Sequence, residues 1–152
     1  HAEGAARSGV RTVLLRFGVV LTRAGGALAK MLPLFRAGLG GRLGSGRQWM
    51  SWVGSDDVVG AVQHALADGR CTGPINVVAP GAVTNAEFTA TLARVLKRPA
   101  VLPAPAWALR LAFGQMADEA LLASARAAPV RLTETGYAFR HAGLETALRA
   151  VL

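Results

Sequence analysis

Residues 12–21 read TVLLRFGVVL, and this stretch decides how the rest of the chain is interpreted. Thr12 to Arg16 form a short apolar run with β-branched residues, which predicts a buried strand. Phe17 to Leu21 continue in the same extended character, with Gly18 where the backbone must pass close to another group. A strand that is apolar on both faces needs cover on both sides, as in parallel sheets. We therefore expect this strand to belong to a larger parallel sheet whose other strands are missing from these 152 residues.

The next segments predict a helix, a loop and a second strand. Residues 27–37 have apolar positions at helical spacing, and Pro33 within them should kink or restart the helix. The glycine-rich stretch 38–46 predicts a loop. Residues 47–53 predict a strand that forms one arm of a hairpin turned at Ser45 and Gly46.

The remainder of the chain predicts more helix than strand. Ser55 is a good N-cap for a helix that ends near Gly69, and residues 75–79 predict a short strand. Thr84 and Glu87 match a capping box, which predicts a helix that ends before Pro99. Four further helical segments are expected, beginning at Pro105, Met116, Pro129 and Leu144.

Composition narrows the class of protein. Hydrophobic residues make up 52% of the chain and charged residues 17%, which predicts a folded domain and not a disordered chain. No apolar run approaches the roughly 20 residues that span a bilayer, and no signal-type segment is present. We therefore expect a cytoplasmic protein without a membrane partner. The single cysteine, Cys71, fits a small structural residue in a reducing compartment.

The net charge of +8 leaves three interpretations open. The basic residues are scattered and are not interleaved with aromatic residues, so nucleic-acid binding is the weakest of the three. A compositional bias toward alanine and arginine is the simplest interpretation. A positive lining for an anionic cofactor or substrate is the second.

Several long motifs then resemble one known family. The string GGALAKMLPLFRAGLGGRLGSGRQWMSWV runs from Gly25 to Val53, and SDDVVGAVQHAL follows from Ser55 to Leu66. With LLRFGVVL before them and GPINVVAPGAVTNAEF after them, they resemble the epimerase family of atypical short-chain dehydrogenases/reductases. The resemblance covers about residues 9–152 and includes that family's small C-terminal domain of unassigned function.

The resemblance implies an α/β fold, namely the last strands of a doubly wound parallel sheet plus a small helix-rich domain on the substrate side. Residues 1–72 would be the end of the dinucleotide-binding domain, with a substrate-side hairpin and helix. Residues 73–152 would be the small C-terminal epimerase-family domain.

Two hallmarks of full-length relatives are missing from these residues. There is no glycine-rich turn between a strand and a helix, and no catalytic Tyr–Lys pair. Tyr137 is the only tyrosine, and His141 stands four residues later instead of lysine, so Tyr137 is interpreted as a packing residue. No catalytic residue is assigned. Neither His64 nor His141 has partners at metal-ligand spacing, so no metal is expected.

The resemblance also implies where a cofactor, NADP or NAD, would lie. The first strand would end beside the nicotinamide, with the backbone of Gly18, Val19 and Val20 bordering it. Arg16 would reach a phosphate, or brace a carboxylate such as that of Asp57. The alternative for Gly18 is that it relieves strain at the end of a strand.

The substrate side is assigned to Arg47, Gln48 and Trp52. Arginine offers a fork for carboxylate or phosphate, and tryptophan offers a flat apolar wall. The alternative makes Trp49 and Trp52 the core of a hairpin, with Gln48 on the surface. Relatives usually carry histidine where this chain has Gly54, so a substrate contact there would be lost.

These expectations lead to one functional hypothesis and its rivals. The chain would be the C-terminal portion of an NAD(P)-dependent epimerase or reductase, acting on a small molecule of nucleotide-sugar type and inactive by itself. The alternative is a non-catalytic interaction or regulatory module, linked to cell division, that uses the same fold. Oligomeric state is left open by the sequence.

Overall fold

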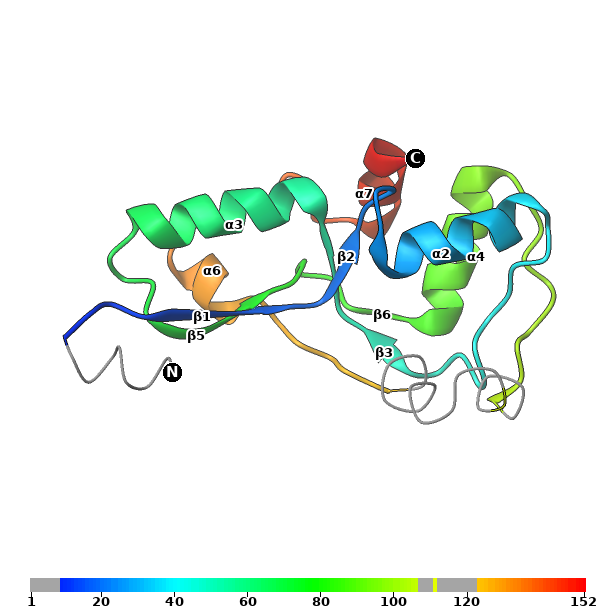
Figure 1. Cartoon of the computed structure of the whole chain (residues 1–152), viewed down its shortest axis with the longest axis horizontal. Coiled ribbons are helices and arrows are strands. Elements are labelled where there is room, and N and C mark those ends of the chain that lie inside the picture. Colours follow the sequence, from blue (N-terminus) through cyan, green and yellow to red (C-terminus); the bar gives the residue numbers. More distant parts are fainter. Residues whose placement is uncertain (1–8, 107–110, 112–122) are drawn as a thin grey trace.

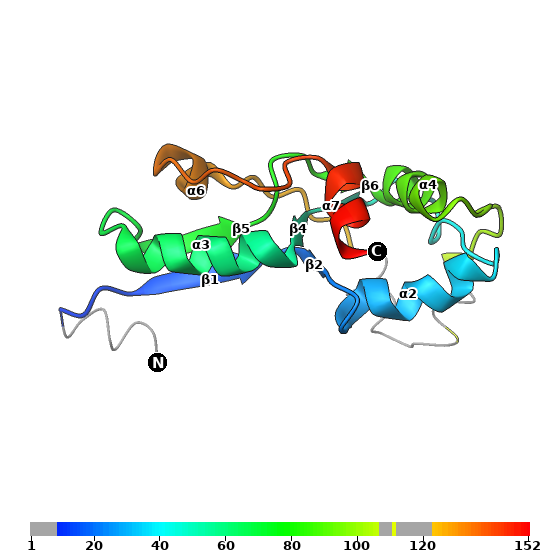
Figure 2. The ribbon, with the colours of Figure 1, turned by 90° about the horizontal axis from the view of Figure 1, so that it is seen from above.

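The computed structural model describes residues 9–106, 111 and 123–152. Figures 1 and 2 show an elongated molecule with β1, β5, α3 and α6 at one end and with α2 and α4 at the other. The strand β2 and the helix α7 lie between the two ends. The helices expected from Pro105 and from Met116 lie mostly outside the described residues.

The first strand has the expected position and a parallel partner. β1 (Val13–Phe17) pairs with β5 (Gly73–Val77), with Leu15 opposite Ile75. The face that carries Leu14 and Arg16 is uncovered, since Leu14 keeps 41% of its surface exposed, whereas Val13 and Leu15 on the other face pack against the buried core. Among the described residues, no strand pairs with the other edge of β1. β1 and β5 therefore form the border of the expected larger sheet.

Two buried clusters hold the molecule together, and β4 (Trp52–Gly54) separates them. Because side chains alternate along a strand, Trp52 enters one cluster while Val53 enters the other. β4 pairs in parallel with β2 (Val19–Leu21), with Val20 opposite Val53. We call one cluster the helical cluster: Leu21, Leu28, Leu32, Phe35, Trp52, Ala79, Phe88, Leu92, Leu144, Ala147 and Leu148. We call the other the sheet cluster: Val53, Ala61, Ala65, Cys71, Ile75, Val77 and Leu132.

Three helices surround the helical cluster. They are α2 (Gly26–Arg36), α4 (Asn85–Leu96) and α7 (Leu144–Val151). The expectation that Pro33 restarts its helix is wrong, because α2 runs through it as one element. The capping box at the start of α4 is confirmed: the Glu87 amide donates to Thr84 Oγ1, and the Thr84 amide donates to the Glu87 carboxylate.

The expected hairpin at Ser45 and Gly46 is not formed. A turn is present there, since the Gly46 amide donates to the Leu43 carbonyl and Gly46 has φ +71°. The strand that follows, β3 (Trp49–Met50), instead pairs antiparallel with β6 (Val83–Thr84). Leu43, before the turn, pairs with Ala104. The segments on the two sides of the turn therefore do not pair with each other.

Helix α3 (Ser55–Ala67) covers the inner face of β1 and β5, as Figure 2 shows. Its N-cap is Gly54 and not the expected Ser55. At its other end the Arg11 guanidinium donates to the carbonyls of Ala65 at 2.7 Å and Leu66 at 2.9 Å. This contact satisfies carbonyls that the helix itself leaves unpaired. The N-terminal strand segment is thereby tied to the helix that packs on it.

The C-terminal part closes both clusters. α6 (Val130–Glu134) places Leu132 in the sheet cluster, and it is followed by Gly136 with φ +84°, as expected of a helix-ending glycine. Cys71 is buried in the same cluster, where a structural residue was expected. Both clusters draw residues from each side of the predicted domain boundary at 72/73. The two-domain division stays a prediction.

Candidate functional site

A cavity of about 430 Å³ opens where β1 ends, and we call it the Gly18 cavity. The end of β1, the start of β2, one face of α2 and the strand β3 contribute to its wall. Its described lining is Arg16, Phe17, Gly18, Val19, Ala27, Met31, Leu43, Trp49, Met50, Ser51, Asn76, Val78, Asn85, Ala123, Ala125 and Ala127. Most of these side chains are apolar, and Arg16 is the only charged one among them.

Gly18 is required by close packing at this point. A Cβ on it would lie 2.5 Å from the carbonyl oxygen of Ser51, a distance that no side chain tolerates. The Gly18 amide donates to the Val77 carbonyl at 3.3 Å, and the Val19 amide donates to the Ser51 carbonyl at 2.8 Å. The close approach is thus made by the chain's own backbone. These two amides are already engaged and are not free for a ligand.

An extended segment, residues 123–128, crosses the cavity, and we call it the strap. The Ser51 hydroxyl donates to the Ala125 carbonyl at 2.9 Å and accepts from the Ala127 amide at 2.8 Å. The Ala125 amide donates to the Trp49 carbonyl at 3.0 Å. The Arg126 guanidinium lies 4.3 Å from the centre of the Trp49 ring. The strap therefore forms a fixed part of the wall.

With this geometry in place, the chain can be compared with known proteins. Residues 104–151, which include the strap, match the model of a domain of unknown function (DUF1731). An epimerase family protein of Mycobacterium tuberculosis is 51% identical over 144 residues, covering 95% of this chain and 48% of that protein. This chain belongs to the epimerase family of atypical short-chain dehydrogenases/reductases. It corresponds to the C-terminal part of its relatives and spans about half of their length.

Solved structures of relatives agree on the fold. The crystal structure of human epimerase family protein SDR39U1 with NADPH matches with a TM-score of 0.91 and 40% identity, over 98% of this chain and 52% of that one. A nucleoside-diphosphate sugar epimerase from Corynebacterium glutamicum matches with a TM-score of 0.73 and 32% identity, over 99% of this chain and 28% of that one. The α/β class and the membership of an extended short-chain dehydrogenase fold are confirmed.

The four residues predicted to bind the cofactor do not all meet at the cavity. Arg16, Gly18 and Val19 line it, whereas Val20 points to the opposite side and packs against the sheet cluster. Arg16 makes no hydrogen bond or ion pair with Asp57, so the predicted brace is absent. Arg16 is exposed and lines the cavity, on the strand position paired with Asn76.

The three residues predicted for the substrate side lie outside the lining of the Gly18 cavity. Trp52 is 1% exposed, and its indole N–H donates to the Gly81 carbonyl at 2.7 Å. Gln48 is 8% exposed, and its side-chain amide donates to the Leu43 carbonyl at 3.0 Å. Arg47 is exposed. Sequence reasoning missed most of the lining, including Ser51 and the strap. The only local signal of the strap is the alternation of alanine with polar residues.

Asp57 ties the start of α3 to the C-terminal segment, through partners that the sequence did not indicate. The fully buried carboxylate accepts from the Tyr137 hydroxyl at 3.0 Å and from the amides of Arg140 at 2.8 Å and His141 at 3.1 Å. The pKa of Tyr137 is raised to about 12, mainly by burial and secondly by its hydrogen bond to the Asp57 carboxylate. Tyr137 also packs edge-on against Phe139, in agreement with its interpretation as a packing residue.

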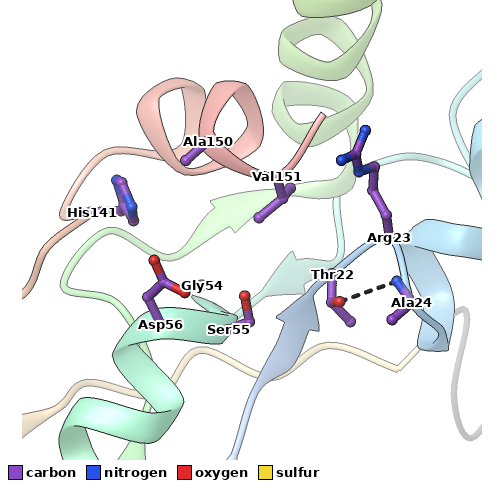
Figure 3. A pocket seen from close by; sticks show the side chains of 9 residues that line it. All are labelled: Thr22, Arg23, Ala24, Gly54, Ser55, Asp56, His141, Ala150 and Val151. Carbon is purple, nitrogen blue, oxygen red and sulfur yellow. Dashed lines mark hydrogen bonds between the residues drawn. The ribbon is translucent and has the colours of Figure 1, made fainter.

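A second cavity, of about 460 Å³, lies on the other side of β4 at the start of α3. Figure 3 shows Asp56 and His141 on one side of it and Arg23 on the other. A Cβ on Gly54 would lie 3.7 Å from the His141 ring, so an imidazole from the C-terminal segment stands beside Gly54. The described residues hold no cluster of three metal-ligating side chains.

The helices in the described part of the chain also bear on the membrane question. None of them combines the length and the apolar character that crossing a bilayer requires.

Proposed function

We propose that this chain supplies the substrate side and the nicotinamide border of the pocket in an NAD(P)-dependent epimerase or reductase, and that it is inactive by itself. The observation that carries the proposal is the position of the Gly18 cavity. It opens at the end of a parallel strand whose outer edge and one face are uncovered. In doubly wound sheets, ligands bind at the carboxyl ends of the strands.

The residues at this border could pack against a nicotinamide but offer it no backbone hydrogen-bond donors. The amides of Gly18 and Val19 already have partners, so Phe17, the β1–β2 backbone and Val19 would provide a shaped wall and no amide donors. The Arg16 guanidinium would bind a phosphate or another anionic group beside the cavity. The cofactor would supply the hydride chemistry, while this chain orients the reacting groups.

The predicted substrate residues enter the proposal with different roles. Arg47 would meet an anionic part of a small-molecule substrate, because its side chain is exposed. Gln48 and Trp52 would act by holding the glycine-rich loop and β4 in place, since both are buried and bonded to backbone carbonyls. The proposed setting is the cytoplasm. The proposed cofactor is NADP or NAD.

A chimera tests the proposal. This chain would be joined to the half of the Mycobacterium tuberculosis relative that it does not match, and both the chimera and the chain alone would be titrated with NADPH and NADH by calorimetry. We expect micromolar binding by the chimera and none by the chain alone. Micromolar binding by the chain alone would contradict the proposal. A folded chimera that binds neither nucleotide would contradict it too, and would favour the non-catalytic interaction module.

A further inference from the structure

An exposed apolar patch lies at the end of the molecule opposite β1, where Figures 1 and 2 show α2 and α4. We call it the distal patch: Leu34, Leu39, Pro99, Val101, Leu102 and Pro103, all exposed. We propose that the distal patch and the basic side chains around it bind the surface of an anionic lipid bilayer. This surface lies outside the Gly18 cavity, so the inference does not depend on the proposed function.

Backbone contacts between two loops make the distal patch continuous. The first loop follows α2, and its Leu39 amide donates to the Leu34 carbonyl at 2.9 Å. The second loop follows α4, and its Leu102 amide donates to the Gly40 carbonyl of the first at 3.3 Å. A Cβ on Gly41 would overlap the Leu102 carbonyl, so the two loops pack as closely as their backbones allow. The apolar side chains of both loops therefore belong to one surface.

Four large aliphatic side chains of the distal patch are in contact with water. Leu34, Leu39, Val101 and Leu102 each keep more than half of their surface exposed. Single exposed apolar side chains are ordinary on a protein surface and need no explanation. A contiguous group of them marks a site of interaction with a protein or a membrane.

The segments that build the distal patch carry basic residues and no acidic ones. Residues 4–55 contain no aspartate or glutamate, and residues 88–117 contain none either. Arg94 on α4 pairs with Glu145 on α7 at 3.6 Å. In the described part of the chain, five other exposed basic side chains of these segments make no hydrogen bond or ion pair: Lys30, Arg36, Arg42, Lys97 and Arg98. The patch is thus bordered by positive charge that lacks an internal partner.

Charge and residue type distinguish between the possible partners. A second copy of this chain would bring the same basic side chains face to face, which opposes association. Single-stranded nucleic acid stacks on aromatic side chains, and protein interfaces are enriched in aromatic anchors, whereas the distal patch has no aromatic residue. Aliphatic residues bordered by cations suit an anionic bilayer: the apolar side chains enter the acyl boundary, and the cations meet the lipid headgroups.

Binding of this kind needs no segment that spans the membrane. The expectation of a protein without a membrane partner came from the absence of such a segment, and binding at the bilayer surface replaces it. A further strand beside β1 would be added at the other end of the molecule and would leave the distal patch free. The cytoplasmic leaflet carries anionic lipids, which attract basic side chains close to its surface.

Co-flotation with lipid vesicles tests the inference. The probes are vesicles of phosphatidylcholine alone and vesicles of phosphatidylcholine and phosphatidylglycerol in equal parts. We expect the chain to bind the anionic vesicles only, and to be released as the salt concentration rises, because salt screens the headgroup charge. The chimera with the other half of the Mycobacterium tuberculosis relative should bind in the same way.

Two double variants separate the apolar from the electrostatic contribution. Val101→Ser with Leu102→Ser should weaken binding by at least about tenfold, because two apolar side chains no longer enter the bilayer. Arg36→Gln with Arg98→Gln should weaken it by about twentyfold, since each basic residue at an anionic surface contributes about fivefold.

Arg131→Gln with Arg140→Gln is the matched control. It removes the same net charge as the patch arginine pair, from exposed side chains outside the segments that build the patch. It should change binding by no more than about twofold, because charges that stay distant from the bilayer are screened. The glutamine variants alter exposed side chains alone, so they keep the test decisive if the serine variant fails to fold.

Three results would overturn the inference. Equal loss of binding by the patch arginine pair and by the control pair would mean that net charge alone attracts the chain. Failure to bind the anionic vesicles would leave an acidic protein as the partner of the distal patch. Binding by the chain but not by a folded chimera would show that the other half of the protein covers the patch.

Discussion

The helical cluster and the β1–β5 sheet differ in how completely the chain covers them. In the helical cluster, Phe88, Leu92 and Leu148 are at most 1% exposed, because α2, α4 and α7 surround them. In the β1–β5 sheet, α3 covers the face that carries Leu15 and Ile75, while Leu14 on the other face stays 41% exposed. Parallel sheets normally carry helices on both faces. The chain thus encloses the helical cluster on all sides, whereas it leaves the outer face and one edge of β1 uncovered.

The largest effect is expected in the enclosed cluster. Phe88→Ala should lower the free energy of unfolding by about 3–5 kcal/mol, because it removes a buried ring and leaves a cavity that the surrounding helices cannot fill. Urea unfolding followed by circular dichroism measures this loss. A loss below about 1 kcal/mol would mean that the helical cluster is not closely packed and that its contrast with the uncovered strand β1 is false.

A somewhat smaller loss is expected where the C-terminal segment is tied to α3. Asp57→Ala should cost about 3 kcal/mol, because the Tyr137 hydroxyl and the amides of Arg140 and His141 lose their buried acceptor. Asp56→Ala is the matched control, since that side chain is 59% exposed and its contact with Arg140 is 4.0 Å. It should change stability by no more than about 0.5 kcal/mol. Equal losses for the two variants would show that the Asp57 carboxylate does not anchor the C-terminal segment to α3.

The same anchor predicts how stability depends on pH in the alkaline range. The pKa of Tyr137 is raised in the folded chain from 10.0 to about 12 by burial and by its bond to Asp57, so the folded state holds the phenol proton more tightly than the unfolded state. The stabilisation is complete below pH 10 and is lost as the pH rises toward 12. Tyr137→Phe should remove this part of the decline. Because Tyr137 is the only tyrosine, absorbance titration reads its pKa directly, and an unshifted value would contradict the prediction.

The smallest effect on stability is expected at the open border. Leu14→Ser should change the free energy of unfolding by no more than about 0.5 kcal/mol, because the side chain is already in contact with water. It should also reduce self-association, since an uncovered apolar strand favours edge-to-edge contacts. Analytical ultracentrifugation compares the two proteins. A large loss of stability would show that another part of the chain covers this face.

The features that the sequence predicted well are those set by neighbouring residues. The capping box of Thr84 and Glu87 depends on residues three apart, and the apolar run of β1 is visible in five residues. The failures come from contacts between distant segments. The partner of β3 is β6 and not the segment before Gly46, and no local sequence pattern predicts this pairing. The same holds for Asp57, whose partners lie more than 79 residues along the chain.

In the candidate site, too, features set by neighbouring residues could be predicted and features set by distant contacts could not. Gly18 could be identified from the sequence, because glycine in a strand indicates close approach of backbone. That the approaching group is the Ser51 carbonyl depends on how β2 lies against β4. Trp52 was assigned to the substrate side on its residue type alone, whereas the alternation of β4 turns it into the helical cluster. The strap was missed because a run of small residues has no periodic apolar signal.

Amide hydrogen exchange along β1 tests the open border most directly. The bonds from Gly73 to the Thr12 carbonyl and from Gly18 to the Val77 carbonyl anchor a parallel ladder. Alternation then turns the amides of Leu14 and Arg16 toward β5, and those of Val13, Leu15 and Phe17 toward the other edge.

Exchange would be followed by NMR in the chain alone and in the chimera with the relative's other half. We predict that Leu14 and Arg16 are protected in both proteins, and that Val13, Leu15 and Phe17 become protected only in the chimera. Protection of these three amides in the chain alone, or their continued fast exchange in a folded chimera, would contradict the claim that β1 is the border of a larger sheet.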